Sequence, residues 1–156
     1  MKFQIRGLPA SNFSHLLTLD DDGLRSHLAV RRVVDSHPGF PCRVSLQDAA
    51  IGENVLLLNY EHLAVAGPYR SSHAIYVREC AMNATLETNE VPEVLRRRLL
   101  SVRAFDGVGM MQDADVTPGA DLELVIRRML GHRSVAFLHI HNAKPGCYAA
   151  SAHRAD

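Results

Sequence analysis

The sequence has no surplus of charge of either sign. Its 156 residues include 17 basic and 17 acidic side chains, so the formal net charge is zero when the nine histidines are neutral. Proteins that bind nucleic acid or an anionic membrane surface need a basic surplus or a basic stripe. We therefore expect no nucleic-acid partner and no polybasic membrane anchor.

Long apolar runs and paired cysteines are also missing. No stretch approaches the roughly 20 apolar residues of a membrane-spanning helix, and residues 1–13 do not resemble a secretory leader. The cysteines, Cys42, Cys80 and Cys147, are odd in number and far apart, which is typical of a reducing compartment. We therefore predict a cytoplasmic protein without a membrane partner, and the length predicts a single domain over residues 1–156.

The spacing of apolar residues predicts an α+β fold. We expect about three helices, near residues 20–28, 92–99 and 117–130, with Thr117 and Pro118 starting the last one and a further helical stretch at 13–17. Most connections are too short for parallel crossovers, so we predict a largely antiparallel sheet of about seven or eight strands. The expected strands are 2–8, 30–35, 54–62, 72–79, 102–106, 110–116, 135–142 and 147–153.

Two histidines separated by one residue are the strongest local signal for a site. His139 and His141 lie on an expected strand, where residues i and i+2 point to the same face about 6.5–7 Å apart. Two imidazoles at this spacing can converge on one divalent metal, such as zinc or iron, but a complete site needs further ligands. The alternative is a pair of histidines hydrogen-bonded within an ordinary polar sheet face.

The missing ligand must come from another strand. His73 is the first choice and Glu61 is the second, because both lie on expected strands. Asp113 and Asp115 repeat the i, i+2 spacing, although an exposed hairpin face explains them better. Four of the nine histidines fall on or at the end of expected strands: His62, His73, His139 and His141.

The final expected strand bears on the same face. If the turn at 144–146 keeps an even parity, Tyr148, Ala150 and Ala152 lie beside the histidine pair, and small alanines there indicate a pocket. In an acid–base site His141 would move a proton, while Tyr148 and Asn142 would orient a small polar substrate. The same parity places Cys147 on the opposite face.

Cysteine and arginine offer other chemistry. Cys147 near a histidine, or Cys42 beside Arg43 in a proline-rich loop, could act as a reactive thiol. An inert structural thiol is the alternative for both. Arg43 is also a candidate to bind a small carboxylate or phosphate, as are Arg70, Arg78 and Arg103, although ion pairing explains these arginines too.

Four stretches of the sequence resemble one known family. They are PGFPCRVSLQDAAIGENVLLLNYEH, YRSSHAIYVRE, VLRRRLLSVRAFD and HIHNAKPGCYAA, which occur in this order along the chain. Together they are similar to a small bacterial family, domain of unknown function 1203, over nearly the whole length. The resemblance implies a bacterial, cytoplasmic, single-domain protein, and it implies no activity and no catalytic residues.

Three functions remain open, and whether the protein is an enzyme is left undecided. The lack of a complete catalytic signature favours a domain that binds a small polar or anionic ligand or a partner, including a second copy in a homodimer. One alternative is a small metal-dependent or acid–base enzyme that uses His139 and His141. The other is a thiol-based enzyme or redox sensor that uses Cys147 or Cys42.

Overall fold

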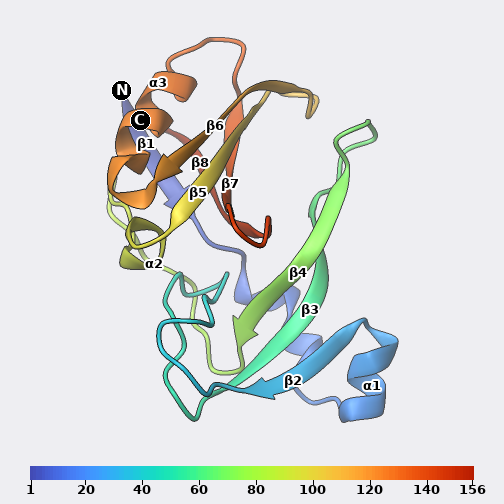
Figure 1. Cartoon of the computed structure of the whole chain (residues 1–156). Coiled ribbons are helices and arrows are strands. Elements are labelled where there is room, and N and C mark those ends of the chain that lie inside the picture. The colour runs from blue at the N-terminus through green and yellow to red at the C-terminus, as the bar shows by residue number, and fades with distance from the viewer.

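The computed structural model describes all 156 residues as eight strands and three α-helices, which confirms the α+β class. The strands divide between two sheets instead of forming one. The first sheet, in the order β1-β8-β7-β5-β6, contains β1 (Lys2–Arg6), β5 (Leu99–Phe105), β6 (Met111–Pro118), β7 (Phe137–Asn142) and β8 (Tyr148–Ala155) (Figure 1). The second, in the order β2-β3-β4, contains β2 (Ala29–Val33), β3 (Asn54–Leu63) and β4 (Ser71–Arg78).

All pairs of neighbouring strands are antiparallel, as the short connections predict. In the five-stranded sheet, alternation along β7 sends Leu138 and Ile140 into the core beneath α3 (Leu122–Leu130). His139 and His141 therefore lie on the other face. Alternation thus gives β7 one apolar face and one face that carries histidines.

The start of α3 differs from the prediction. Thr117 pairs with Leu100 and Pro118 pairs with Leu99, so these residues end β6 and do not cap a helix. A 3-10 turn, η3 (Gly119–Asp121), comes before the helix. A Cβ atom on Gly119 would lie 1.9 Å from the carbonyl oxygen of Leu95, so only glycine lets the chain pass α2 (Glu93–Arg96) this closely.

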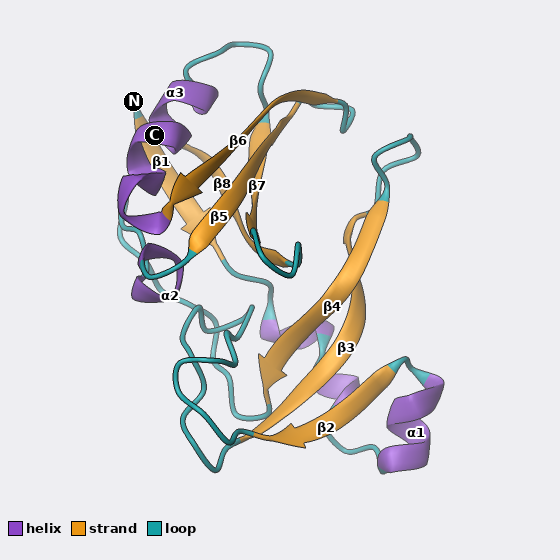
Figure 2. Ribbon diagram, viewed as in Figure 1, coloured by secondary structure: helices purple, strands orange, loops and turns teal.

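The three-stranded sheet packs against the first part of the chain (Figure 2). The acidic triplet starts α1 (Asp21–Ser26) as predicted, because the Asp20 side chain accepts a hydrogen bond of 2.8 Å from the amide of Gly23. Residues 13–17 do not form a regular helix. The chain there makes two 3-10 turns, η1 (Ala10–Asn12) and η2 (Ser14–Leu16).

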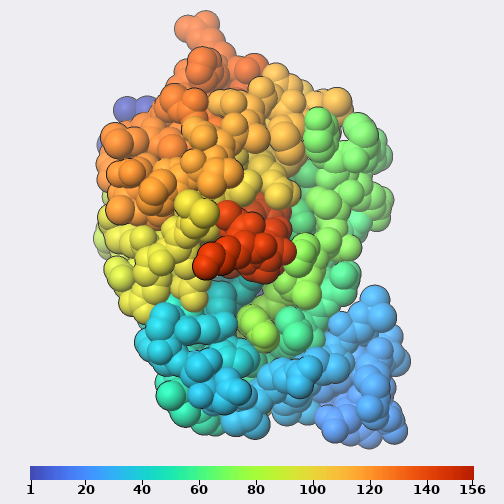
Figure 3. Space-filling model, viewed as in Figure 1, coloured from blue at the N-terminus to red at the C-terminus, as the bar shows by residue number.

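Two connections complete the region between the sheets. The long connection from β2 to β3 carries Arg43, whose amide donates to the carbonyl of Tyr76 on β4 at 3.0 Å. The turn between β7 and β8, residues 143–147, lies at the surface between the five-stranded sheet and β4 (Figure 3).

The longest helix, α3, has nine residues, and none of the helices has the length and apolar character needed to cross a membrane.

Candidate functional site

Three histidines from the two sheets form one cluster. His62 comes from β3, whereas His139 and His141 come from β7. Each offers one ring nitrogen, and these nitrogens all lie within 4.8 Å of one another. The ring centroid of His62 is 5.5 Å from that of His139 and 5.0 Å from that of His141. We call His62, His139 and His141 the histidine triad.

A β-bulge accompanies the third histidine. The pairing of β3 with β4 shifts register between Glu61 and Leu63, so His62 sits at the irregularity. Bulges bend a strand and change the direction of a side chain. The sequence pattern places His62 at the end of an expected strand but does not identify it as a ligand. The bulge that sets its direction has no signature in the sequence.

Burial keeps the histidine triad neutral. Burial, together with the positive charge of Arg103 and of the neighbouring histidines, lowers the pKa of His62 to about 4 and of both His139 and His141 to about 3. His139 and His141 are almost fully buried, and His62 is half-buried. At neutral pH all three rings therefore carry a free lone pair, which is the form that binds a metal ion.

Each member of the histidine triad has a buried nitrogen without a hydrogen-bond partner. These atoms are Nδ1 of His62, Nδ1 of His139 and Nε2 of His141. Buried polar atoms are normally paired, so three such atoms in one cluster need an explanation. In His141, Nδ1 lies 3.0 Å from the carbonyl oxygen of Gly146 and donates to it, which leaves Nε2 as the acceptor nitrogen. Metal-binding histidines are oriented by this type of second hydrogen bond.

Tyr148 lies against the histidine triad. Its ring stacks on His62 with centroids 5.2 Å apart and an angle of 11°, and it meets His139 edge-on at 4.9 Å. Burial raises the pKa of Tyr148, so the phenol stays protonated at neutral pH. Tyr148 therefore shares the face of the histidines, where the parity of the final strand placed it.

The alanine argument for a pocket on that face is wrong. Ala150 pairs with Ile140 and Ala152 with Leu138, and both alanines are buried in the core on the α3 side. The pairing shifts register between Ile140 and His141, which places an extra residue, Ala149, in β8. This second bulge changes the parity of the strand, so Tyr148 faces the histidines while the alanines do not.

The other candidate ligands lie outside the triad. Glu61 is exposed and forms an ion pair with Arg70. The ring of His73 lies near the carbonyl of the next residue, with Nδ1 3.2 Å from that oxygen. Asp113 and Asp115 are on an exposed strand, where they lie 3.8 and 2.5 Å from the guanidinium of Arg128.

Arg43, Asn142 and Cys147 form a second polar cluster beside the triad. The buried guanidinium of Arg43 donates from Nε to the carbonyl of Tyr148 at 2.7 Å and from Nη2 to Sγ of Cys147 at 2.9 Å. Its Nη1 donates to the carbonyl of Pro41. The amide nitrogen of Asn142 lies 3.6 Å from Sγ of Cys147, while its Oδ1 is buried without a partner.

Burial sets the electrostatics of this second cluster. It lowers the pKa of Arg43, and no carboxylate forms an ion pair with this residue.

Cys42, the residue before Arg43, lies in the core. Its Sγ accepts hydrogen bonds from the backbone amides of Arg78 at 3.3 Å and Ser45 at 3.5 Å. Arg78 itself forms an ion pair with Glu53. Cys42 is thus held as a buried packing residue.

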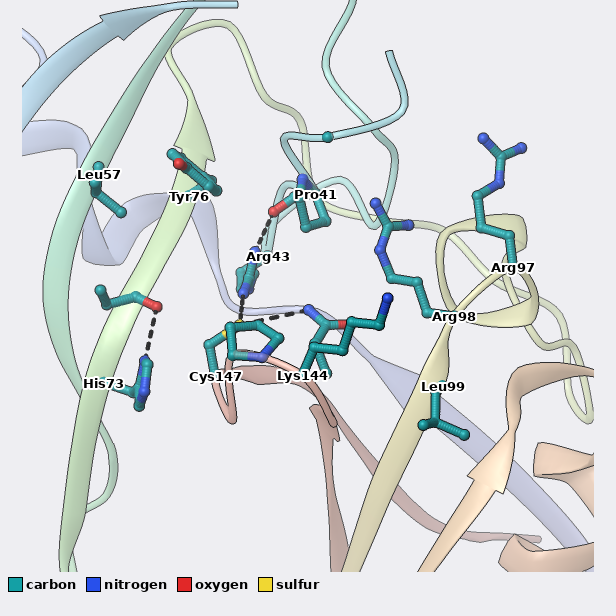
Figure 4. Close-up of a pocket in the computed structure, with 14 residues that line it drawn as sticks. Pro41, Arg43, Leu57, His73, Tyr76, Arg97, Arg98, Leu99, Lys144 and Cys147 are labelled. Carbon is teal, nitrogen blue, oxygen red and sulfur yellow. Dashed lines mark hydrogen bonds between the residues drawn. The ribbon is translucent and has the colours of Figure 1, made fainter. Parts of the chain in front are cut away.

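A cleft of about 510 Å³ opens beside this cluster. Figure 4 shows Arg43 between Pro41 and Cys147, with dashed lines marking its hydrogen bonds. One wall comes from the three-stranded sheet and the other from β5 and the turn at 143–147. The lining residues are Gly39, Pro41, Arg43, Leu57, His73, Ala74, Tyr76, Arg97, Arg98, Leu99, Asn142, Lys144, Pro145 and Cys147.

Comparison with known proteins identifies a family and no activity. The model of a family described as "Protein of unknown function (DUF1203)" matches residues 39–154, which include the histidine triad, Arg43, Asn142 and Cys147. No curated protein matches the chain, and no solved structure does. The match covers well over half of the chain and agrees with the resemblance found in the sequence. The chain therefore belongs to the DUF1203 family.

Proposed function

We propose that this protein binds one divalent transition-metal ion through His62, His139 and His141. One observation carries the proposal: three neutral imidazoles from two sheets converge, and each has a buried nitrogen without a partner. A metal ion satisfies all three lone pairs at once. Ordinary hydrogen bonding within the sheet face would have paired these atoms instead.

The donor set favours zinc. Imidazole suits zinc, copper, nickel and iron, but a typical non-haem iron(II) site combines two histidines with one carboxylate. The triad contains no carboxylate, because Glu61 is paired with Arg70 outside it. Tetrahedral zinc with Zn–N bonds of 2.0–2.1 Å places its nitrogen ligands about 3.3 Å apart. Nitrogens now up to 4.8 Å apart would therefore approach each other by up to about 1.5 Å on binding.

The geometry suggests two consequences of binding. Three protein ligands leave the fourth tetrahedral position for water or another small ligand, as in zinc sites that carry out chemistry. Because His62 and the other two histidines lie in different sheets, the ion would also tie β3 to β7. The three unpaired cysteines support a reducing compartment such as a cytoplasm.

The test is a metal titration of the purified protein. After chelation and removal of the chelator, zinc should bind at one equivalent per chain by calorimetry, and cobalt(II) should give the intense visible bands of a tetrahedral site. His62→Ala and His141→Ala should each weaken zinc binding by more than about a hundredfold. His73→Ala is the matched control, since it removes a half-buried strand histidine outside the triad.

Two results would overturn the metal site. One is a folded wild-type protein that takes up no zinc and gives no tetrahedral cobalt spectrum. The other is zinc binding that His73→Ala reduces as strongly as His62→Ala does. Circular dichroism of each variant separates a loss of ligands from a loss of fold.

A further inference from the structure

The cleft beside the triad contains a buried cation without a carboxylate counter-ion. Arg43 is only 2% exposed, and its side-chain partners are two carbonyl oxygens and one cysteine sulfur. A buried charge without an opposite charge is strongly unfavourable, and arginine cannot lose its proton to escape this cost. Arg43 uses three of its five N–H donors, so two remain for another acceptor.

The charges around Arg43 make this imbalance larger. None of the residues that line the cleft is acidic, whereas Arg97, Arg98 and Lys144 all line it with Arg43. Two acids outside the lining are already paired: Asp48 with Arg98 at 2.5 Å and Arg97 at 3.8 Å, and Glu93 with Arg97 at 3.2 Å. Lys144 forms no ion pair. Arg43 and Lys144 are therefore left without acidic partners, and the cleft carries a surplus of positive charge in a protein whose net charge is zero.

Two further features point to a ligand. Asn142, which is 6% exposed, lines the cleft, and its buried Oδ1 has no hydrogen-bond partner. Apolar side chains contribute to both walls, with Leu57 and Tyr76 on the three-stranded sheet and Leu99 on β5 across from them (Figure 4). A cleft of about 510 Å³ with an apolar wall and a few convergent polar groups has the size and character of a small-molecule site.

We propose that this cleft binds a small organic anion. Its carboxylate or phosphate group lies against Arg43 and Lys144, its apolar body packs on Leu57 and Tyr76, and a hydroxyl or amine group donates to Oδ1 of Asn142. The bound anion supplies the negative charge that the guanidinium lacks. The proposal does not depend on metal binding, because it uses none of the three histidines.

Three probes of similar size test the charge requirement. Benzoate and phenyl phosphate carry the two head groups, and benzamide is the neutral counterpart of benzoate. We expect both anions to shift the backbone amide NMR resonances of residues 142–144, 146 and 147 and the side-chain amide of Asn142, with benzamide binding at least about tenfold more weakly. The tighter of the two anions identifies the head group that the cleft prefers. Equal binding of benzoate and benzamide, or no shift at these residues with either anion, would overturn the proposal.

A pair of lysine variants tests the location. The chain has only two lysines, Lys144 at the cleft and Lys2 at the start of β1. Lys144→Met should weaken the preferred anion about fivefold, and Lys2→Met should leave its affinity unchanged. Arg43→Met should weaken binding by more than about tenfold if it folds, and the lysine pair decides the question if it does not. Equal effects of the two lysine variants would contradict a site at this cleft.

Discussion

Two buried polar clusters contact the β7–β8 hairpin, and burial has opposite results in them. In the triad, burial lowers the pKa of three histidines until they are neutral, and it leaves lone pairs without partners. In the cleft, the guanidinium of Arg43 keeps its charge because its proton is held too strongly to be lost. The lone pairs of neutral histidines favour binding of a cation, and the fixed positive charge of Arg43 favours binding of an anion. The same desolvation therefore favours a cation in one cluster and an anion in the other.

The largest expected effect concerns the cationic partner of the triad. Zinc at about 1,000 times its dissociation constant should raise the free energy of unfolding by about 4 kcal/mol, because the ion binds the folded state. His62→Leu should abolish this increment, whereas His73→Ala should retain it. Urea denaturation with zinc and with chelator measures the difference. An equal increment in His62→Leu would show that zinc acts elsewhere.

The next effect is the pH dependence of the metal-free protein. His139 and His141 have folded pKa values of about 3, below the ordinary value of 6.5, so the unfolded chain binds more protons as pH falls below 6.5. Stability is therefore lost on acidification, and the loss continues until pH approaches 3. For these two residues together it reaches about 3 kcal/mol between pH 6.5 and pH 5.

Denaturation of the metal-free protein at these two pH values measures that loss. His139→Leu should reduce the slope of the unfolding free energy against pH by the contribution of about one bound proton. A wild-type stability that stays flat from pH 6.5 to pH 5 would mean that the buried rings are not held neutral.

A smaller effect comes from Arg103, which lies opposite His139 in the sheet and makes no ion pair. Its positive charge lowers the pKa of all three triad histidines, after burial, and the same repulsion opposes a metal cation. Arg103→Met should therefore tighten zinc binding about threefold to tenfold. Calorimetry at constant pH is the measurement, and weaker binding in this variant would contradict the electrostatic argument.

The smallest effect is coupling between the two clusters. Each cluster makes a hydrogen bond to the β7–β8 hairpin, because His141 donates to the carbonyl of Gly146 and Arg43 donates to that of Tyr148. A ligand that orders one contact should make the other easier to form. We expect zinc to tighten benzoate binding about twofold, and benzoate to tighten zinc binding by the same factor. Zinc affinity measured with and without saturating benzoate tests this reciprocity.

Local sequence patterns predict much of the fold. Alternation and apolar runs place the eight strands, and the acidic triplet at Asp20 marks the start of α1. Division into two sheets was not predictable, because it depends on pairing between distant segments such as β1 and β8. The last helix forms as α3, but its predicted start at Thr117 is wrong for a related reason, since the sheet pairing of β6 overrides the local capping signal.

The candidate site was less predictable than the fold. The i, i+2 spacing identifies His139 and His141, and parity brings Tyr148 to their face. His62 could not be assigned as their partner, because a bulge in β3 determines its direction. The contact between Arg43 and Cys147 joins residues 104 positions apart, and no local pattern records such a contact. Spacing along one strand thus indicates half of a site, and the tertiary fold supplies the other half.

The pairing of β1 with β8 has a consequence for how the protein is made. Lys2 lies opposite Ala155, so the first strand of the chain has only the last strand as its neighbour. The ribosome synthesises β1 before β8, so Phe3 and Ile5 have no neighbouring strand until β8 has emerged. Contacts this distant in sequence form slowly, and unpaired apolar strands attract chaperones or aggregate. The five-stranded sheet is therefore completed only after β8 has been synthesised, and a chain cut short before β8 leaves β1 without its sheet neighbour.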